Sequence, residues 1–170
     1  DCVTGSTDTV NITSATNVGA ALAGSATATQ RIGVIDAKTA SDDTLSVTAK
    51  KVTNVGAAVA AAAKVVQDIG VIEGSDITGS AVTVYSTSDI TNVGAALAGS
   101  AKSDQQIGVI DVKRGSDVTV SVNATGKLES VGAGLAGSGY ALQEIGDVKA
   151  DLAQTVSVAV QTKDVSATAL

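Results

Sequence analysis

Side-chain amides recur along this chain at nearly constant spacing, which is the pattern with the clearest chemical meaning. One set lies two positions before an Ile-Gly pair and consists of Gln30, Gln67, Gln105 and Gln143. A second set precedes a Val-Gly pair and consists of Asn17, Asn54 and Asn92, with Ser130 in the fourth place. Amides stacked one strand spacing apart hydrogen-bond to each other in cross-β assemblies. The spacing predicts a glutamine ladder facing inward and an asparagine ladder at a turn; ordinary turn and surface amides are the alternative.

Charged residues occupy a third set of equivalent positions, namely Asp36, Glu73, Asp111 and finally Lys149. Three stacked carboxylates repel each other, and a head-to-tail stack of chains would bring Lys149 against Asp36 of the next chain. We therefore expect Asp36 and Lys149 to belong to an assembly interface. Solvated surface charge is the simpler alternative. Calcium binding is a third one, although the spacing matches no known calcium loop.

The chain offers little for catalysis. It contains no histidine to act as a base, and Cys2 is its only cysteine. No glycine-rich phosphate loop follows a strand in the required pattern, and the Gly-Ser pairs lack the setting of a nucleophile elbow. We therefore expect a protein that is not an enzyme and that uses no cofactor or metal.

Three further residues bear on covalent modification. Cys2 is either a free thiol near a terminus or the site of an intermolecular disulfide in a secreted protein. Asn11-Ile-Thr and Asn123-Ala-Thr are glycosylation sequons, which give weak support to an extracellular setting.

The amides belong to a longer phrase that occurs four times. The first copy reads Asn17-Val-Gly-Ala-Ala-Leu-Ala-Gly followed by Gln30-Arg-Ile-Gly-Val-Ile-Asp, and its isoleucine recurs as Ile69, Ile107 and Ile145. A fixed period of this size is typical of repeat folds, in which each unit buries its face by stacking on the next. We expect one repeat domain over residues 1–170, with repeats near 10–45, 46–81, 82–117 and 118–154 and a partial repeat at 155–170.

The segment after each Asn-Val-Gly has two interpretations. A helix is suggested by the second copy, where Val55, Val59, Ala62, Val66 and Ile69 follow 4-3-4-3 spacing. Polar residues interrupt this stripe in the first and third copies. The fourth copy would also place five glycines in or beside one helix, each costing about 1 kcal/mol relative to alanine.

The strand interpretation explains more of the sequence. With a period of two, one face carries Val18, Ala20, Leu22, Gly24, Ala26, Ala28, Gln30, Ile32 and Val34. The opposite face carries the positions that vary between copies, such as Arg31, Asp68, Gln106 and Glu144. A constant face and a variable polar face indicate an inside and an outside. The pattern therefore predicts strands, with the first set of residues pointing inward.

A second strand is predicted before each phrase, at Thr9–Ile12, Ser46–Thr48, Val82–Tyr85, Val118–Val122 and Thr155–Val160. The fold class that follows is all-β: a β-solenoid or a closely related layered cross-β fold. It should have about four rungs of 37–38 residues and a partial fifth, stacked in parallel about 4.8 Å apart.

Composition limits the partners. The formal net charge of −6 argues against nucleic acid, which needs a basic face. No apolar run approaches the ~20 residues of a membrane span. The apolar content comes from small aliphatic residues, and the chain has no proline, so every backbone N–H is available to a sheet.

The fifth leading strand has no phrase of its own to pack on. Its alternating residues Val156, Val158 and Val160 therefore form a candidate assembly interface. Neither end has a visible cap, and open strand edges are templates for another copy. A head-to-tail contact between identical chains does not close, so it gives a fibre. We expect the last strand either to be donated to a neighbouring chain or to continue its stack.

Residues 10–160 resemble the functional amyloid subunits of bacterial biofilms, the curli and Fap-type families. The likeness rests on imperfect repeats, period-matched Asn and Gln, the Asn-Val-Gly phrase and the absence of proline. The repeat is longer than a curlin repeat, and the order of motifs differs. The resemblance implies a secreted subunit of an extracellular or cell-surface fibre that provides adhesion and matrix strength, with other copies of itself and an export machinery as partners.

Two other functions remain open. One is a monomeric β-solenoid adhesin or ligand-binding module. The other is a helical repeat or coat protein that uses the 4-3 stripe of the second copy.

Overall fold

The computed structural model describes residues 2–170, with side chains from Gly5 onward, and it confirms the β-solenoid prediction. The described residues contain no helix, so the helical repeat alternative is wrong. The strands are β1 (Cys2–Thr4), β2 (Thr7–Ala21), β3 (Ala26–Ser41), β4 (Thr44–Ala58), β5 (Ala63–Thr78), β6 (Ala81–Ser86), β7 (Ile90–Ala96), β8 (Ala101–Gly134) and β9 (Gly139–Ala169).

Each coil consists of a leading and a trailing segment, and each segment pairs in parallel with its equivalent in the next coil. The leading segments are β2, β4, β6 with β7, and the second halves of β8 and β9. The trailing segments are β3, β5, and the first halves of β8 and β9. The register aligns Gln30, Gln67, Gln105 and Gln143 in one row across the stack. Equivalent residues of successive repeats are therefore neighbours in space.

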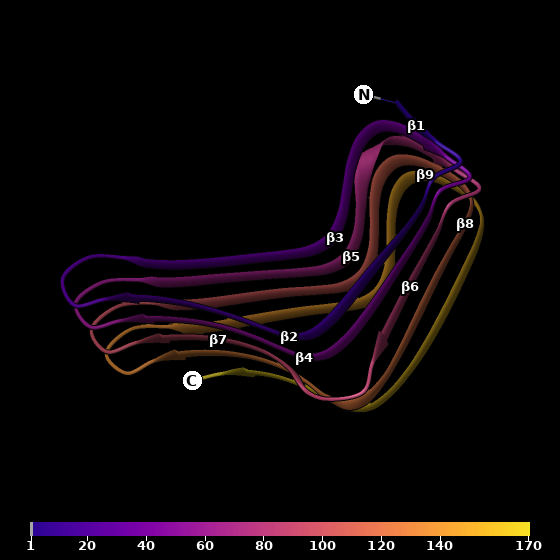
Figure 1. Ribbon diagram of the computed structural model, residues 1–170. Coiled ribbons are helices and arrows are strands. Elements are labelled where there is room, and N and C mark those ends of the chain that lie inside the picture. Colours follow the sequence, from indigo (N-terminus) through magenta and orange to yellow (C-terminus); the bar gives the residue numbers. More distant parts are fainter. Residues whose placement is uncertain (1) are drawn as a thin grey trace.

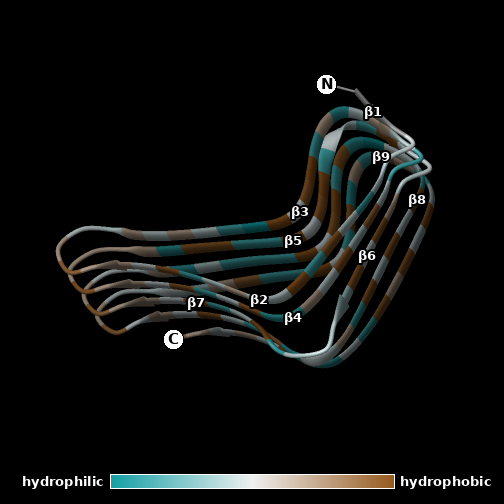
Figure 2. Cartoon of the chain, in the orientation of Figure 1, coloured by the Kyte–Doolittle hydropathy of each residue, from teal (hydrophilic) through white to brown (hydrophobic). Residues whose placement is uncertain are grey.

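The coils are bent into two parts (Figure 1). A thin arm contains residues 16–31 and their equivalents, and a wider body contains the rest of each coil. The body holds the main core, which includes Leu45, Val47, Ile69, Ile72 and Val84. The arm interior holds a separate cluster of alanines in two rows, namely Ala26, Ala63 and Ala101 of the trailing segments and Ala58 and Ala96 of the leading segments. Figure 2 shows brown apolar positions repeating from coil to coil along both parts.

Glycine explains why the arm is thin. Gly19, Gly56, Gly94 and Gly132 form one row on the inner side of the leading segments. A Cβ on Gly19 would lie 2.6 Å from the carbonyl oxygen of Thr27 in the facing segment. The two segments approach this closely only because the side chain is missing. The Asn-Val-Gly phrase therefore encodes close contact between the two segments of the arm.

A second glycine row makes the bend between arm and body. Gly33, Gly70, Gly108 and Gly146 all have φ between 58° and 63°, a left-handed conformation that glycine adopts readily. A Cβ on Gly33 would lie 2.5 Å from Cγ2 of Val47 in the facing segment. The Ile-Gly pair of the repeated phrase is thus a core isoleucine followed by a corner.

One part of the inside and outside assignment is wrong. Ala26, Ala28 and Ile32 point inward as expected, but Val18 and Leu22 of the same predicted face point outward, with exposures of 64% and 81%. Residues 22–25 make the turn at the tip of the arm, and the inner positions run from Ala21 directly to Ala26. Because this interval is an odd number of residues, the inward-facing positions change from odd-numbered to even-numbered residues across the turn. A period of two therefore cannot be continued through a turn.

Candidate functional site

The glutamine row forms a ladder through the interior at the junction of arm and body. Nε2 of Gln67 donates to Oε1 of Gln30 at 2.9 Å, Gln105 donates to Gln67 at 2.7 Å, and Gln143 donates to Gln105. Gln67 and Gln105 are fully buried, and each also donates to a leading-segment carbonyl, that of Thr91 or Glu129. A buried amide without partners is costly, so the stack and the facing segment together satisfy this row.

The asparagine row forms a second ladder, inside the arm. Nδ2 of Asn17 donates to Oδ1 of Asn54 at 3.0 Å, and Asn54 donates to Asn92 at 3.1 Å. The prediction that these residues lie at a turn is wrong, because they lie within strands, and Asn54 and Asn92 are fully buried. Each asparagine also donates to a carbonyl of the trailing segment, at Thr29, Val66 or Asp104. The row therefore joins the two segments of the arm as well as the coils.

The two ladders run in opposite directions. The glutamines donate toward the N-terminal coils, whereas the asparagines donate toward the C-terminal coils. At the C-terminal end of the glutamine row, Oε1 of Gln143 is buried and has no partner among the described residues. At the other end, the carbonyl oxygen of Gln30 accepts from Gln67, so the amide nitrogen of Gln30 is the donor group of the first rung. The ends of this row are thus an acceptor and a donor.

Charged side chains lie on the solvent-facing side of the trailing segments, where the arm meets the body. Nε of Arg31 lies 3.2 Å from Asp68, and its Nη2 lies 2.8 Å from Glu73. Burial raises the pKa of Asp68, and the negative charge of Glu73 adds to this, while Arg31 opposes it. Burial also acts to raise the pKa of Glu144, but hydrogen bonds from Lys149 and Gln106 outweigh it and leave that pKa below its usual value.

The register places Asp36, Glu73, Asp111 and Lys149 in one row, as the sequence predicts. Within the chain Lys149 already has a partner, because its Nζ lies 2.5 Å from Oε2 of Glu144. Among the described residues, no three acidic, histidine or cysteine side chains are grouped so that they could hold a metal ion.

The two ends of the stack are open and chemically different. At the C-terminal end, Val156, Val158 and Val160 lie in core rows but are 42–45% exposed, because none of residues 2–170 forms a further coil over them. At the N-terminal end, the row of Val158 and Leu45 ends in Asp8. An inward-pointing charge weakens an edge as a template. The side chain of Cys2 lies outside the described part of the chain, so its predicted role is not addressed by the structure.

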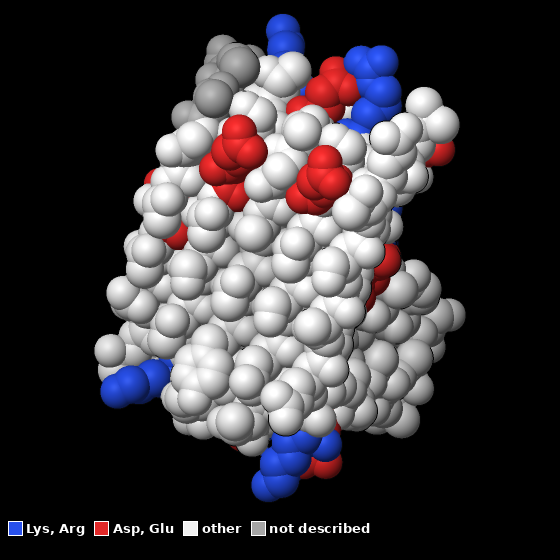
Figure 3. Space-filling model, turned by 90° about the vertical axis from the view of Figure 1, so that its right-hand side faces the viewer, with Lys and Arg blue, Asp and Glu red and all other residues white. Residues whose placement is uncertain are grey.

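Two side faces also run the length of the stack. The apolar arm face is the outer side of the leading segments in the arm and consists of Val18, Ala20, Leu22, Val55, Ala57, Val59, Val93, Ala95, Leu97, Val131, Ala133 and Leu135. The neutral body face is the outer side of the same segments in the body and includes Thr9, Asn11, Ser46, Thr48, Thr83, Tyr85, Ser121 and Asn123. Figure 3 shows this second face, with charged side chains only around its margin.

Both predicted sequons are on the neutral body face, where Asn11 and Asn123 share a row with Tyr85. The apolar arm face was missed from the sequence, because its residues were assigned to the interior. A signal for it was present. The amides of the Asn-Val-Gly phrase must face inward to be satisfied, which turns the intervening valine, alanine and leucine outward.

Taken together, the rows and open ends define a parallel β-solenoid of about four coils with amide ladders inside it. No known protein family, curated protein or solved structure matches the chain. The described residues include no helix of the length and hydrophobicity that a membrane span requires.

Proposed function

We propose that this chain is a structural subunit of an extracellular fibre and that it self-assembles head to tail through its open coil edges. The observation that carries the proposal is the C-terminal coil, whose core valines and buried Gln143 acceptor have no neighbour on their outer side among the described residues. Another copy offers the missing groups, since its Gln30 presents an amide nitrogen and its first coil repeats the same rows.

Charge supports a specific register between copies. If the trailing segment 26–41 of the next copy stacks on 139–154, three of the four charged rows bring opposite charges together, and the fourth brings Asp147 against Val34. Arg31 then meets Glu144, Asp36 meets Lys149, and Lys38 meets Asp151, as the internal register requires. Neighbours of opposite charge in one row already form ion pairs within the chain, as Arg31 with Asp68 and Arg114 with Asp76 show.

This register has a consequence for the leading segments. Residues 156–169 would occupy the level that residues 7–21 of the next copy occupy in the single chain, so one of these segments must leave. Residues 156–169 place Val158 in the core row where residues 7–21 place Asp8. Burying a valine is favourable, whereas burying an unpaired carboxylate is costly. Donation of the last strand to the neighbour is therefore favoured over simple stacking.

The proposal is tested by following fibre growth with negative-stain microscopy and fibre diffraction. The intact chain should give filaments with a meridional reflection near 4.8 Å. A chain lacking Thr155–Leu170 should assemble at least tenfold more slowly. Filaments of the shortened chain that grow at the normal rate would refute strand donation, and an intact chain that stays monomeric would refute the fibre function.

A charge exchange tests the register. Lys38 and Asp151 are both exposed, so reversing them leaves the core of the single chain untouched. Asp151→Lys should slow assembly, because it places two lysines together at each junction. The double variant Lys38→Asp with Asp151→Lys should restore the rate. A double variant as slow as the single one would contradict the register.

A further inference from the structure

We infer that the apolar arm face pairs with the same face of a second stack, so that fibres of this protein are built from two stacks side by side. The inference deepens the proposed fibre function and rests on it. All twelve residues of the face are valine, alanine or leucine, and Leu22, Leu97 and Leu135 are 50–81% exposed. Contiguous apolar surface of this kind on a soluble chain marks an interaction site.

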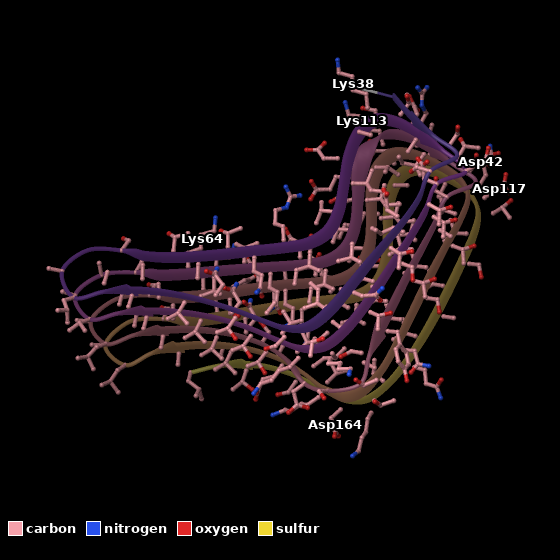
Figure 4. All side chains as sticks on the ribbon, in the orientation of Figure 1. Lys38, Asp42, Lys64, Lys113, Asp117 and Asp164 are labelled. Atoms are coloured by element: carbon pink, nitrogen blue, oxygen red, sulfur yellow. The ribbon has the colours of Figure 1, made fainter. Side chains whose placement is uncertain are left out.

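Folding of the single chain does not account for this face. The interior of the arm is already complete, because the asparagine ladder and the two alanine rows fill the space between its two segments. The opposite outer side of the arm is polar, with Lys64 projecting from it in Figure 4 and Lys102 half exposed beside Tyr140. The arm therefore has one solvated face and one apolar face that no described part of the chain covers.

The shape of the face fits a copy of itself. A groove of about 910 Å³ runs along it, lined by the alanine column that includes Ala57 and Ala95 and by the leucine column that includes Leu97 and Leu135. When two such faces meet about a two-fold axis, the large column of each can fill the small column of the other. Large residues facing small ones are the condition for interdigitated packing. A two-fold contact uses the same patch on both partners.

The area of the patch decides when pairing occurs. Four coils about 4.8 Å apart, each presenting five residues of about 3.4 Å, give roughly 300 Å² per copy. A stable interface buries about 800 Å² on each partner. Two single chains should therefore pair only weakly, whereas two long stacks repeat the contact at every subunit. Another identical stack also shares the same 4.8 Å step along its whole length, which is why we assign it as the occupant rather than an unrelated protein.

The test compares two lysine substitutions on outward-facing positions of the leading segments. Leu97→Lys lies on the apolar arm face, and Thr83→Lys lies on the neutral body face as the matched control. Mass per length is measured by scanning transmission electron microscopy. Intact and Thr83→Lys fibres should have about twice the mass per length of Leu97→Lys fibres, which should be single stacks with the same diffraction spacing.

Two results would overturn the inference while leaving the fibre function intact. One is equal mass per length for intact and Leu97→Lys fibres, and the other is intact fibres that are already single stacks. If the intact chain forms no fibres, the fibre function fails, and the soluble chain is examined by analytical ultracentrifugation at millimolar concentration. Reversible dimers that Leu97→Lys abolishes and Thr83→Lys retains would support face pairing there, whereas an intact chain that remains monomeric would refute it.

Discussion

At the scale of single residues, the two adjacent glutamines of the third coil show how position decides role. Gln105 is fully buried in the ladder and bonds to the coils on both sides. Gln106 is on the outer side and donates to Glu144. The side chains are identical, and only the first is enclosed by the stack.

The pair provides a controlled prediction. Gln105→Leu leaves Oε1 of Gln67 and Nε2 of Gln143 without the partner they have now, and each unpaired buried group costs about 1–3 kcal/mol. The free energy of unfolding in urea should therefore fall by about 2–5 kcal/mol. Gln106→Leu should change it by less than about 1 kcal/mol. Equal losses in the two variants would mean that the ladder contributes no special stability.

Sequence reasoning found the amide rows because stacking in register follows directly from the repeat period. It misplaced the asparagines, because Asn near glycine is more common in turns than inside a sheet. The burial of Asn54 depends on the carbonyl of Val66 twelve residues away, in the other segment of the arm. The repeat period predicts contacts between equivalent residues of successive coils. It does not predict a contact between two segments of one coil, which depends on the turn that joins them.

At the scale of elements, the corners limit the fold more than the strands do. The corner between trailing and leading segments has a left-handed residue in every coil, at Gly5, Asp42, Gly79, Asp117 and Thr155. Glycine and aspartate tolerate this conformation, whereas a β-branched residue does so poorly. The last coil, which makes the open end, thus contains the most strained corner.

Relieving that corner should stabilise the last strand. Thr155→Gly removes a penalty of about 1–2 kcal/mol and adds flexibility to the unfolded chain worth about 0.5–1 kcal/mol. We expect a net gain of about 0.5–1 kcal/mol, visible as slower amide hydrogen exchange over residues 156–169. Ser157→Gly, two residues later within the strand, should speed exchange there instead. Faster exchange in Thr155→Gly would show that the corner is not strained.

The turn at the tip of the arm explains the largest error in the sequence-based prediction. The segments on both sides of this turn were correctly predicted to be strands. Val18 and Leu22, however, were placed on the inner side and lie on the outer side. The alternation of each strand is set by local chemistry, whereas the phase between two strands is set by the turn that joins them. Since the turn has no proline or Asn-Gly pair to identify its type, the phase could be obtained only from the amides of the Asn-Val-Gly phrase, which must face inward to be satisfied.

At the scale of the whole molecule, the stacked fold follows from the period, but the bend of each coil does not. The bend depends on the left-handed glycines, such as Gly70, meeting valines of the facing segment. Thinness of the arm likewise depends on glycines whose role appears only when two distant segments meet. The number of coils and the rows therefore follow from the period, whereas the cross-section and its apolar arm face depend on contacts between distant segments.

Net charge gives a prediction for assembly. Each chain has a formal charge of −6 at pH 7 and an isoelectric point near 4.4, so copies repel each other at neutral pH and less so on acidification. Fibre growth measured by light scattering should accelerate from pH 7 to pH 5, and also with added salt at pH 7.

The pKa shifts of the carboxylates in the bend predict that the chain stays folded between pH 7 and pH 5, the range in which growth should accelerate. Asp68, whose pKa is raised in the folded chain above its usual 3.8, gains folded-state stability as the pH falls toward that value. Glu144, whose pKa is lowered from 4.5, contributes stability that is present above pH 4.5 and is lost as the pH falls below that value. Circular dichroism should therefore show an intact fold at pH 5. Growth that slows between pH 7 and pH 5 while the fold persists would contradict this account.

The opposite directions of the two amide ladders affect how far a stack can grow. Each aligned column of amides is a row of dipoles along the fibre axis, and a single column would build up polarisation with every added coil. Because the glutamine carbonyls point toward the C-terminal coils and the asparagine carbonyls point toward the N-terminal coils, the two columns oppose each other. The dipoles of the amides therefore add up to little along the axis of a fibre of any length. The electrostatic potential at each tip then changes little as the fibre grows.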